Sequence, residues 1–419
     1  MKKFFMNLFL GTAIVFGATT NLFAGELDVL LDKLVEKGYL TPVEATIIKD
    51  ETKQQVTKEI TQAKSYAVPT WVQKMKIKQD LRLRFQYERK KSDTEGRTRG
   101  RVRYRLGVNT DVTDSVKAGI GLATGGDDPR STNQTFEDVF STPDIRLDYA
   151  YGQWTPTKNL TLIGGKFPRK DFLWAPTDLL WDGDINPEGA SLNLTQDITD
   201  NIEGFLNGGL WIIDTNDQVD RSDPFMTYVQ AGLSAKEEKL DAKGAVTVYS
   251  FHGVEGINLP NDSCTNSGPF KVAGDCTGGV LDKDYDSVAL SGELGIAEPL
   301  ELPVERIAIF GDYVKNVSDN VDLDIGWATG FKVGHKSVKK AGQWQMKYIY
   351  AHLEMDAFLD TFPDSDRYAG GTNVKSHEVA VTYGLKDNVT FGVDYYNSNR
   401  IDGSSDPEHL VQADVLMKF

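Results

Sequence analysis

The sequence has few of the residue types on which most enzymes and metal proteins depend. Its two cysteines, Cys264 and Cys276, show no CxxC or Cys/His spacing typical of a zinc site. No serine and histidine stand where a hydrolase would need them, and the histidines are scattered along the chain. They are His252, His335, His352, His377 and His409. The sequence therefore predicts no enzyme and no metal site.

Positive charge and long apolar segments are also scarce. The chain has 46 Lys and Arg against 61 Asp and Glu, a formal net charge of −15, so nucleic acid is not an expected partner. Beyond the amino-terminal segment, no stretch has the roughly 18 consecutive apolar residues of a membrane helix. Hydrophilic average composition still permits a water-filled barrel, which exposes only alternate strand residues to lipid. The chain is therefore either a soluble exported protein or a barrel.

The first residues have the pattern of a secretory signal peptide. Lys2 and Lys3 precede an apolar stretch, and small residues lead to Ala24. We therefore expect residues 1–24 to be removed on export. An oxidising compartment favours a Cys264–Cys276 disulfide that closes a loop, with two free thiols as the alternative.

Residues 25–70 have helical periodicity and form a predicted periplasmic segment. Within it, Thr41-Pro42-Val43-Glu44 has the arrangement of a capping box, which starts a second helix. The apolar stripe is too thin to bury a core by itself. We expect this segment to pack on its own copies as a coiled coil or on a partner, and the alternative is a loosely ordered tether.

From residue 71 to the carboxy-terminus the hydrophobic pattern has a period of two. Leu81 and Leu83 alternate with Arg82 and Arg84, which places apolar and charged side chains on opposite faces of a strand. The clearest runs are residues 77–87 and 101–109. Further strands are expected near residues 115–124, 144–154, 160–167, 189–196, 202–213, 224–234, 242–252, 285–294, 304–314, 320–332, 342–352, 374–383, 389–398 and 408–419. The total is about sixteen, which predicts an all-β, transmembrane antiparallel barrel over residues 71–419.

The connectors between these strands differ in length in a regular way. Short ones, such as residues 155–159 and 384–388, alternate with connectors that include long ones, such as residues 125–143, 168–188 and 253–284. Bacterial barrels have short periplasmic turns and longer outer loops. The alternation favours a barrel over a soluble sandwich.

Four runs in or next to the longer connectors are distinctive: GGKFP at residues 164–168, FLW at 172–174, WDGDINPEG at 181–189 and DSDRYAGGTN at 364–373. These runs resemble signatures of the putative porin family of Gram-negative outer membranes, with Arg367 standing where an aromatic residue is expected. The resemblance implies a sixteen-stranded outer-membrane barrel that passes small hydrophilic solutes, as a homotrimer in contact with lipid and lipopolysaccharide. It also implies that Phe419 is the signal for the barrel assembly machinery.

Charged residues of two kinds are the candidates for a pore constriction. The loop at residues 168–188 resembles the inward-folded loop of porins and carries Asp171, Asp178, Asp182, Asp184 and Glu188, with Trp174 and Trp181 able to wedge it against the barrel. Basic side chains lie on the lumen faces of the first strands: Arg82, Arg84, Arg101, Arg103 and Arg105, and perhaps Arg146. The five strand arginines from Arg82 to Arg105 are called the arginine ladder below. Opposite charges across the lumen would select polar solutes, whereas direct ion pairs would only hold the loop in place.

Three alternatives remain at this point. A passive diffusion channel is the leading interpretation, and an anion-selective channel is the second. An envelope scaffold or adhesin with little transport is the third. No cofactor is expected, although acidic outer loops at residues 214–223 and 282–286 have oxygen ligands that suit Ca2+. A solvated acidic surface is the preferred explanation of those loops.

Overall fold

The computed structural model describes residues 31–67, 70–215, 223–261, 263–268, 280–299 and 304–419. The predicted signal peptide, residues 1–24, lies outside the described residues. The chain divides into two compact units, Met1–Lys74 and Met75–Phe419.

The first unit contains the expected helices. Residues 31–36 are helical, followed by α2 (Pro42–Ala67) and α3 (Thr70–Gln73). The predicted capping box is confirmed at the start of α2. The Glu44 carboxylate accepts the Thr41 backbone N–H at 2.8 Å, and the Thr41 hydroxyl accepts the Glu44 N–H at 3.3 Å.

Apolar residues of α2 remain uncovered by this chain. Val43 and Ile47 are more than half exposed, as expected for a stripe too thin to bury a core. Within the described residues no helix combines the length and the hydropathy of a membrane span. Whether this segment packs on its own copies, on a partner or as a tether stays a prediction.

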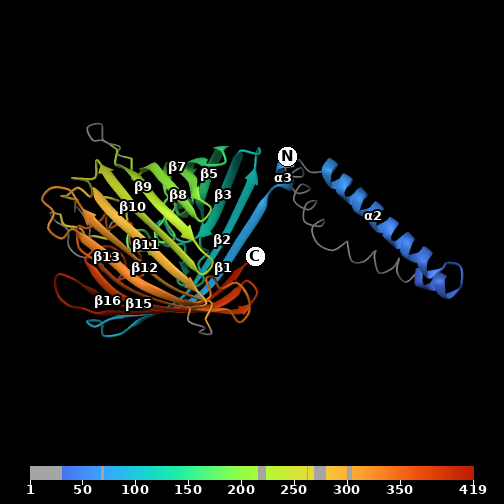
Figure 1. Cartoon of the computed structure of the whole chain (residues 1–419). Helices are drawn as coiled ribbons and strands as arrows, with labels where there is room; N and C mark the ends of the chain where they lie inside the picture. The colour runs from blue at the N-terminus through green and yellow to red at the C-terminus, as the bar shows by residue number, and fades with distance from the viewer. Residues whose placement is uncertain (1–30, 68–69, 216–222, 262, 269–279, 300–303) are drawn as a thin grey trace, which may run out of the picture. The chain divides into compact units, whose positions relative to one another are not determined.

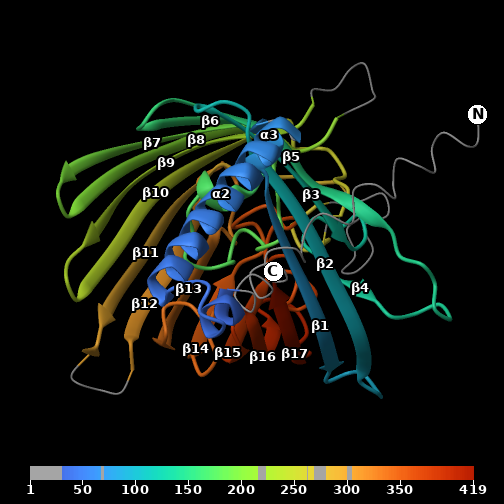
Figure 2. The same cartoon turned by 90° about the vertical axis from the view of Figure 1, so that its right-hand side faces the viewer.

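The second unit is an antiparallel sheet that closes on itself. The described residues form seventeen strands. All except the short β4, which pairs with β2, are hydrogen-bonded to their neighbours in chain order, so β3 pairs with β5. Strand β1 pairs with β17, beside which it lies in Figure 2. Strand β4 has only two residues, so sixteen strands form the barrel shown in Figure 1. The strands are β1 (Lys76–Lys90), β2 (Arg97–Asp111), β3 (Val116–Thr124), β4 (Gln134–Thr135), β5 (Ile145–Thr157), β6 (Leu160–Lys166), β7 (Glu188–Thr199), β8 (Ile202–Ile212), β9 (Phe225–Lys236), β10 (Leu240–His252), β11 (Ser287–Ala297), β12 (Arg306–Asn316), β13 (Ile325–Gly334), β14 (Trp344–Leu353), β15 (Val374–Lys386), β16 (Val389–Arg400) and β17 (Glu408–Lys418).

The predicted strands are confirmed apart from their ends. The largest difference is in β13, expected from residue 320 but beginning at Ile325, because residues 317–324 form a turn in which the Asn316 N–H donates to the Asp324 carbonyl. Strand β4 was missed, since two residues inside the connector 125–143 carry no period-two signal.

Alternation along β1 separates the two faces of the barrel. Leu83 and Phe85 are about half exposed on the outside, whereas Arg84 and Gln86, which alternate with them, are almost fully buried. Apolar side chains outside and polar side chains inside are the arrangement of a barrel with a polar lumen in lipid. The ends of strands β5 and β6, β7 and β8, and β15 and β16 are joined by two-residue turns at 158–159, 200–201 and 387–388.

The largest core of the second unit lies inside the barrel. Two connectors fold inward at the end of the barrel opposite these turns: loop 167–187, between β6 and β7, and loop 354–373, between β14 and β15. They meet where Trp181 stacks on Phe362, with ring centroids 4.7 Å apart. Trp211 of β8 and Tyr249 of β10 pack on the same indole. The interior is therefore partly filled by the chain's own loops.

Candidate functional site

Two glycines that face each other flank loop 167–187, one in the strand before it and one in the strand after it. Gly165 of β6 pairs with Gly189 of β7, and both have positive φ, 119° and 145°. A Cβ at either position would lie within 2.3 Å of a carbonyl oxygen on the neighbouring strand. Only glycine tolerates this approach, which explains the glycines in the two signature runs.

Inside the barrel, hydrogen bonds hold the loop against the opposite strands. The Trp174 N–H donates to the Gln230 side-chain carbonyl at 2.9 Å, and the Thr177 N–H donates to the Asp312 carboxylate at 3.0 Å. The Tyr228 hydroxyl donates to the carbonyl of Phe172 at 2.7 Å. Loop 167–187 is thus fixed across the lumen from β9 to β12. This arrangement gives the loop a defined position from which its charged side chains can act.

The arginine ladder is largely paired with carboxylates. Arg84 forms two 2.8 Å bonds with Asp414, and Arg103 lies 2.8 Å from Asp80. Arg82 is 3.9 Å from Asp414. Arg101 differs, because its hydrogen bonds go to the neutral side chains of Gln86 and Ser131.

Arg105 joins the ladder to loop 167–187. Its guanidinium lies 2.6 Å from the Asp184 carboxylate. Asp184 also accepts hydrogen bonds from the backbone and the hydroxyl of Thr132. Burial opposes ionisation of Asp184, but the charges of Arg105 and Arg103 outweigh it and lower its pKa. Loop and wall therefore meet as an ion pair at this point, and the wall holds the loop.

The other predicted acidic residues are placed differently. Asp182 accepts the N–H groups of Ser365 and Asp184, at 2.9 and 2.8 Å, and so connects the two inner loops. Burial and then the charge of Asp184 raise the pKa of Asp182 to about 7. Asp171 is exposed on loop 167–187, and Glu188 pairs with Lys166 at the start of β7. Neither is in contact with the arginine ladder.

Arg146 lies apart from the ladder. It is 3.8 Å from the exposed Asp144 and donates to the carbonyl of Gly125 at 3.1 Å, near the end of β5. The β3–β5 register pairs Arg146 with the buried Ala123. Its neighbours Ile145 and Leu147 are exposed, so Arg146 lies on the inner face of β5 beyond the bulge opposite Gly121.

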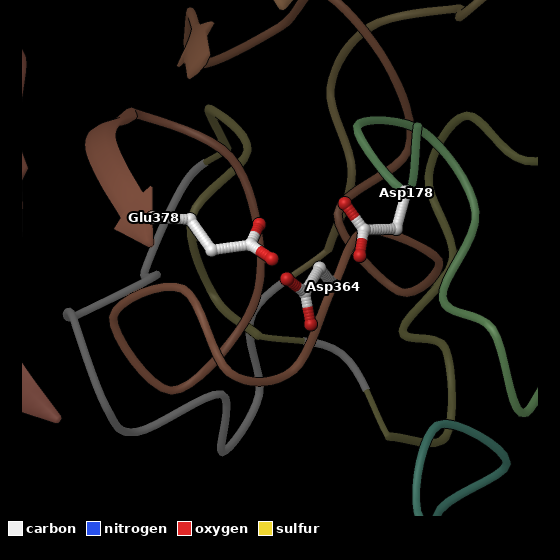
Figure 3. A group of neighbouring side chains, drawn as sticks. All are labelled: Asp178, Asp364 and Glu378. Carbon is white, nitrogen blue, oxygen red and sulfur yellow. The ribbon is translucent and has the colours of Figure 1, made fainter. Parts of the chain in front are cut away.

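A second charged cluster, not found from the sequence, lies where loop 354–373 meets β15. Figure 3 shows the carboxylates of Asp178, Asp364 and Glu378 directed toward one another. The Arg367 guanidinium lies 2.7 Å from both Asp178 and Glu378, and Lys347 of β14 also pairs with Glu378. Burial and then the charge of Asp178 raise the pKa of Asp364. The cations already neutralise much of this cluster, so it fits an internal ion-pair network better than a metal site.

Two cavities lie on either side of loop 167–187. The first, of about 440 Å³, extends to the short-turn end of the barrel, and the second, of about 510 Å³, lies toward β13 to β16. Cationic residues outnumber carboxylates in both. The first includes Lys78, Arg105, Arg169, Lys170 and Lys418, and the second Arg169, Lys170, Lys332 and Lys347. Period-two alternation could have placed Lys332 and Lys347 on the lumen faces, but no sequence signal marks Lys170.

The remaining predicted residues lie at the edges of the barrel. Cys264 is disulfide-bonded, and Cys276 lies outside the described residues. Phe419 extends the β1–β17 pairing, since its N–H donates to the Gln79 carbonyl at 3.0 Å. Of the outer acidic loops, residues 216–222 lie outside the described part, and Asp286 accepts the Phe251 N–H. Ca2+ binding in these loops stays a prediction.

The sequence matches one family model, described as putative porin, over residues 87–277 and 285–419. No curated protein sequence matches the chain. The high-pH structure of OprB from Pseudomonas putida is similar, with a TM-score of 0.55 and 12% identity over 83% of this chain and 95% of OprB. The outer-membrane channel DcaP of Acinetobacter baumannii gives a TM-score of 0.47 and 14% identity over 82% of this chain and 97% of DcaP. At this identity, the similarity to OprB concerns the fold alone.

Proposed function

The chain belongs to the putative porin family, and on this premise we propose that it forms a water-filled channel in the outer membrane for passive diffusion of small hydrophilic solutes and ions. One observation carries the proposal. A closed barrel is crossed by loop 167–187, which leaves a cavity on each side and holds charged side chains in the lumen. A pore needs a constriction of defined size and charge, and this arrangement supplies one.

In this proposal the constriction lies between loop 167–187 and the strands that carry the arginine ladder. The Arg105–Asp184 pair fixes one side of the loop, and hydrogen bonds to Gln230 and Asp312 fix the other. Because the loop is bound to the barrel wall on both sides of the lumen, it cannot move freely when a solute passes. The proposed role is transport rather than catalysis.

We also propose that the barrel is a homotrimer in contact with lipid and lipopolysaccharide, inserted by the barrel assembly machinery. Support for lipid contact comes from the exposed apolar residues on the outer face, such as Leu83, Phe85, Val246 and Val248. The trimer rests on the family, and cross-linking of the protein in outer membranes would test it. A monomer after cross-linking would contradict this part of the proposal alone.

Reconstitution in a planar bilayer tests the channel itself. The purified, folded barrel should give discrete conductance steps, in groups of three if the trimer forms. Folding is checked separately by the shift in electrophoretic mobility between heated and unheated samples. Folded protein that gives no conductance would overturn the channel and favour a scaffold or adhesin, for which deletion of residues 26–65 should give the stronger phenotype.

An anion-selective channel is the second candidate, because one observation favours it. Cationic residues outnumber carboxylates in both cavities beside loop 167–187, although the whole chain has a net charge of −15. Local lumen charge affects a permeating ion more than distant surface charge, which salt screens. A reversal potential in a KCl gradient distinguishes the two candidates. A passive, unselective pore gives a value close to zero.

A further inference from the structure

Most positive charges of the arginine ladder are compensated. Arg84, Arg103 and Arg105 each have a carboxylate oxygen within 3 Å. Such a pair presents little net charge to a passing ion. The ladder therefore holds the wall and the loop together, but contributes less to ion selectivity than its number of arginines implies.

Arg169 is also unavailable to solutes. Its side chain is buried, donates to the carbonyls of Trp181 and Asp182, and lies over the Trp181 ring. The next residue, Lys170, is exposed. Among the described residues, none forms a hydrogen bond or ion pair with the Lys170 ammonium group. The carboxylates of Asp184 and Asp178 attract it at longer range, and the charges of Arg169 and Arg105 repel it.

Lys170 lies beside both inner cavities. Like its neighbour Arg169 and like Gly183, it lines the cavity on each side of loop 167–187. The lysines Lys78 and Lys418 line only the first cavity, near the ends of β1 and β17. Lys332 and Lys347 line only the second and pair with Glu293 and Glu378.

Within the arginine ladder, Arg101 hydrogen-bonds the neutral side chains of Gln86 and Ser131 and has no carboxylate partner among the described residues. It lines a third cavity toward the outer end of β1 and β2, where carboxylates outnumber cations and include Glu88, Asp128 and Asp366. Its charge is therefore offset by its surroundings. Lys170 is a cation of loop 167–187 that lines both inner cavities and has no ion-pair partner among the described residues.

We propose that Lys170 is the residue that sets the ion preference of the pore, and that it favours small anions such as chloride, carboxylates and phosphates. This inference rests on the proposed channel function in its second, anion-selective form. A single charge acts strongly on an ion in a confined lumen, because the effective dielectric constant is lower than in bulk water. Because Lys170 has no ion-pair partner among the described residues, an anion can approach its ammonium group without displacing a carboxylate. A single charge also binds the anion weakly enough to release it.

Gly183 provides a direct test, because a Cβ at this position would lie 3.8 Å from the Lys170 ammonium nitrogen, an ordinary contact distance. In Gly183→Asp a carboxylate is placed beside Lys170 and should compensate its charge. Gly183→Asn has nearly the same shape without the charge and is the matched control. Lys170→Gln removes the charge itself, and Lys158→Gln, in the exposed turn between β5 and β6, makes the same change outside the lumen.

The measurement is the reversal potential of reconstituted channels in a gradient of dilute KCl, where screening is weak. Wild type, Gly183→Asn and Lys158→Gln should prefer chloride. In Lys170→Gln and Gly183→Asp the ratio of chloride to potassium permeability should fall by roughly threefold or more. Each variant is first checked for folding by its heat-dependent mobility.

The outcomes separate the two proposals. No conductance from folded wild-type protein overturns the channel, and this inference with it. Normal conductance with an unchanged permeability ratio in Lys170→Gln and Gly183→Asp overturns only the role of Lys170. Equal shifts in Gly183→Asp and Gly183→Asn would show that bulk, not charge, causes the effect, and would also overturn it. If Lys170→Gln does not fold, the two Gly183 variants decide.

Discussion

The carboxylate of Asp184 lies 2.6 Å from the guanidinium of Arg105, and this ion pair joins loop 167–187 to strand β2. Asp184 is also held by the backbone and hydroxyl of Thr132. The pair therefore has two consequences: it positions the loop, and it cancels one charge of the arginine ladder. Each can be tested by changing one partner at a time.

Neutralising Asp184 and neutralising Arg105 should change the ion selectivity of the pore in opposite directions. Asp184→Asn leaves Arg105 uncompensated, so chloride permeability relative to potassium should rise by roughly twofold. Arg105→Gln leaves Asp184 uncompensated, and the same ratio should fall. The double variant should return close to wild type. Reversal potentials in a salt gradient measure all three, and shifts of the same sign in both single variants would contradict the pairing.

Removal of Arg367 should destabilise the barrel. Its side chain is 3% exposed and contacts Asp178 and Glu378 at 2.7 Å. Arg367→Met removes the cation that pairs with Asp178 and with the buried Asp364, and leaves Glu378 with Lys347 alone. Removing one partner of a buried ion pair typically costs about 3–5 kcal/mol. Thermal unfolding in detergent measures the loss. Arg89→Met, an exposed arginine of β1, should change stability by no more than about 0.5 kcal/mol, and an equal loss in both variants would contradict the prediction.

Asp182 should make stability depend on pH. Burial and the charge of Asp184 raise its pKa from 3.8 to about 7. The native state therefore binds more protons than the unfolded state between about pH 4 and pH 7, and the free energy of unfolding contributed by this group falls as pH rises through that range. Above pH 7 this contribution is constant.

In wild type, Asp182 lowers the free energy of unfolding as pH rises from about 4 to about 7. In Asp182→Asn this fall should be smaller by on the order of 1 kcal/mol or more. Denaturant unfolding at a series of pH values measures it. Asp171→Asn, an exposed aspartate of the same loop, is the control and should leave the slope unchanged. A slope that is the same in Asp182→Asn and wild type would show that Asp182 is ionised normally.

Phe419 should affect assembly rather than stability. Its backbone pairs with Gln79, but its side chain is 63% exposed. Phe419→Ala keeps the backbone pairing, so purified barrel should differ in stability by about 0.5 kcal/mol or less. The amount of folded barrel in outer-membrane fractions should nevertheless fall several-fold. Phe140→Ala, another exposed phenylalanine, should leave that amount unchanged, and equal amounts for all three proteins would exclude an assembly signal at Phe419.

The sequence by itself predicted about sixteen strands, the two faces of regular strands such as β1 and the start of α2. These features are local. Alternation such as Leu83–Arg84 gives a strand two unlike faces, and the Thr41–Glu44 spacing forms a capping box within one turn. Both can therefore be identified without knowing the rest of the fold.

Only the tertiary structure decided which charges are compensated. Arg105 and Asp184 are far apart in the sequence, and they meet because the barrel closes and loop 167–187 folds inside it. The same closure brings Arg367 to Asp178 and leaves Lys170 without an ion-pair partner among the described residues. Ion pairing depends on distances of a few ångströms between side chains from distant strands and loops, and a one-dimensional pattern does not contain those distances.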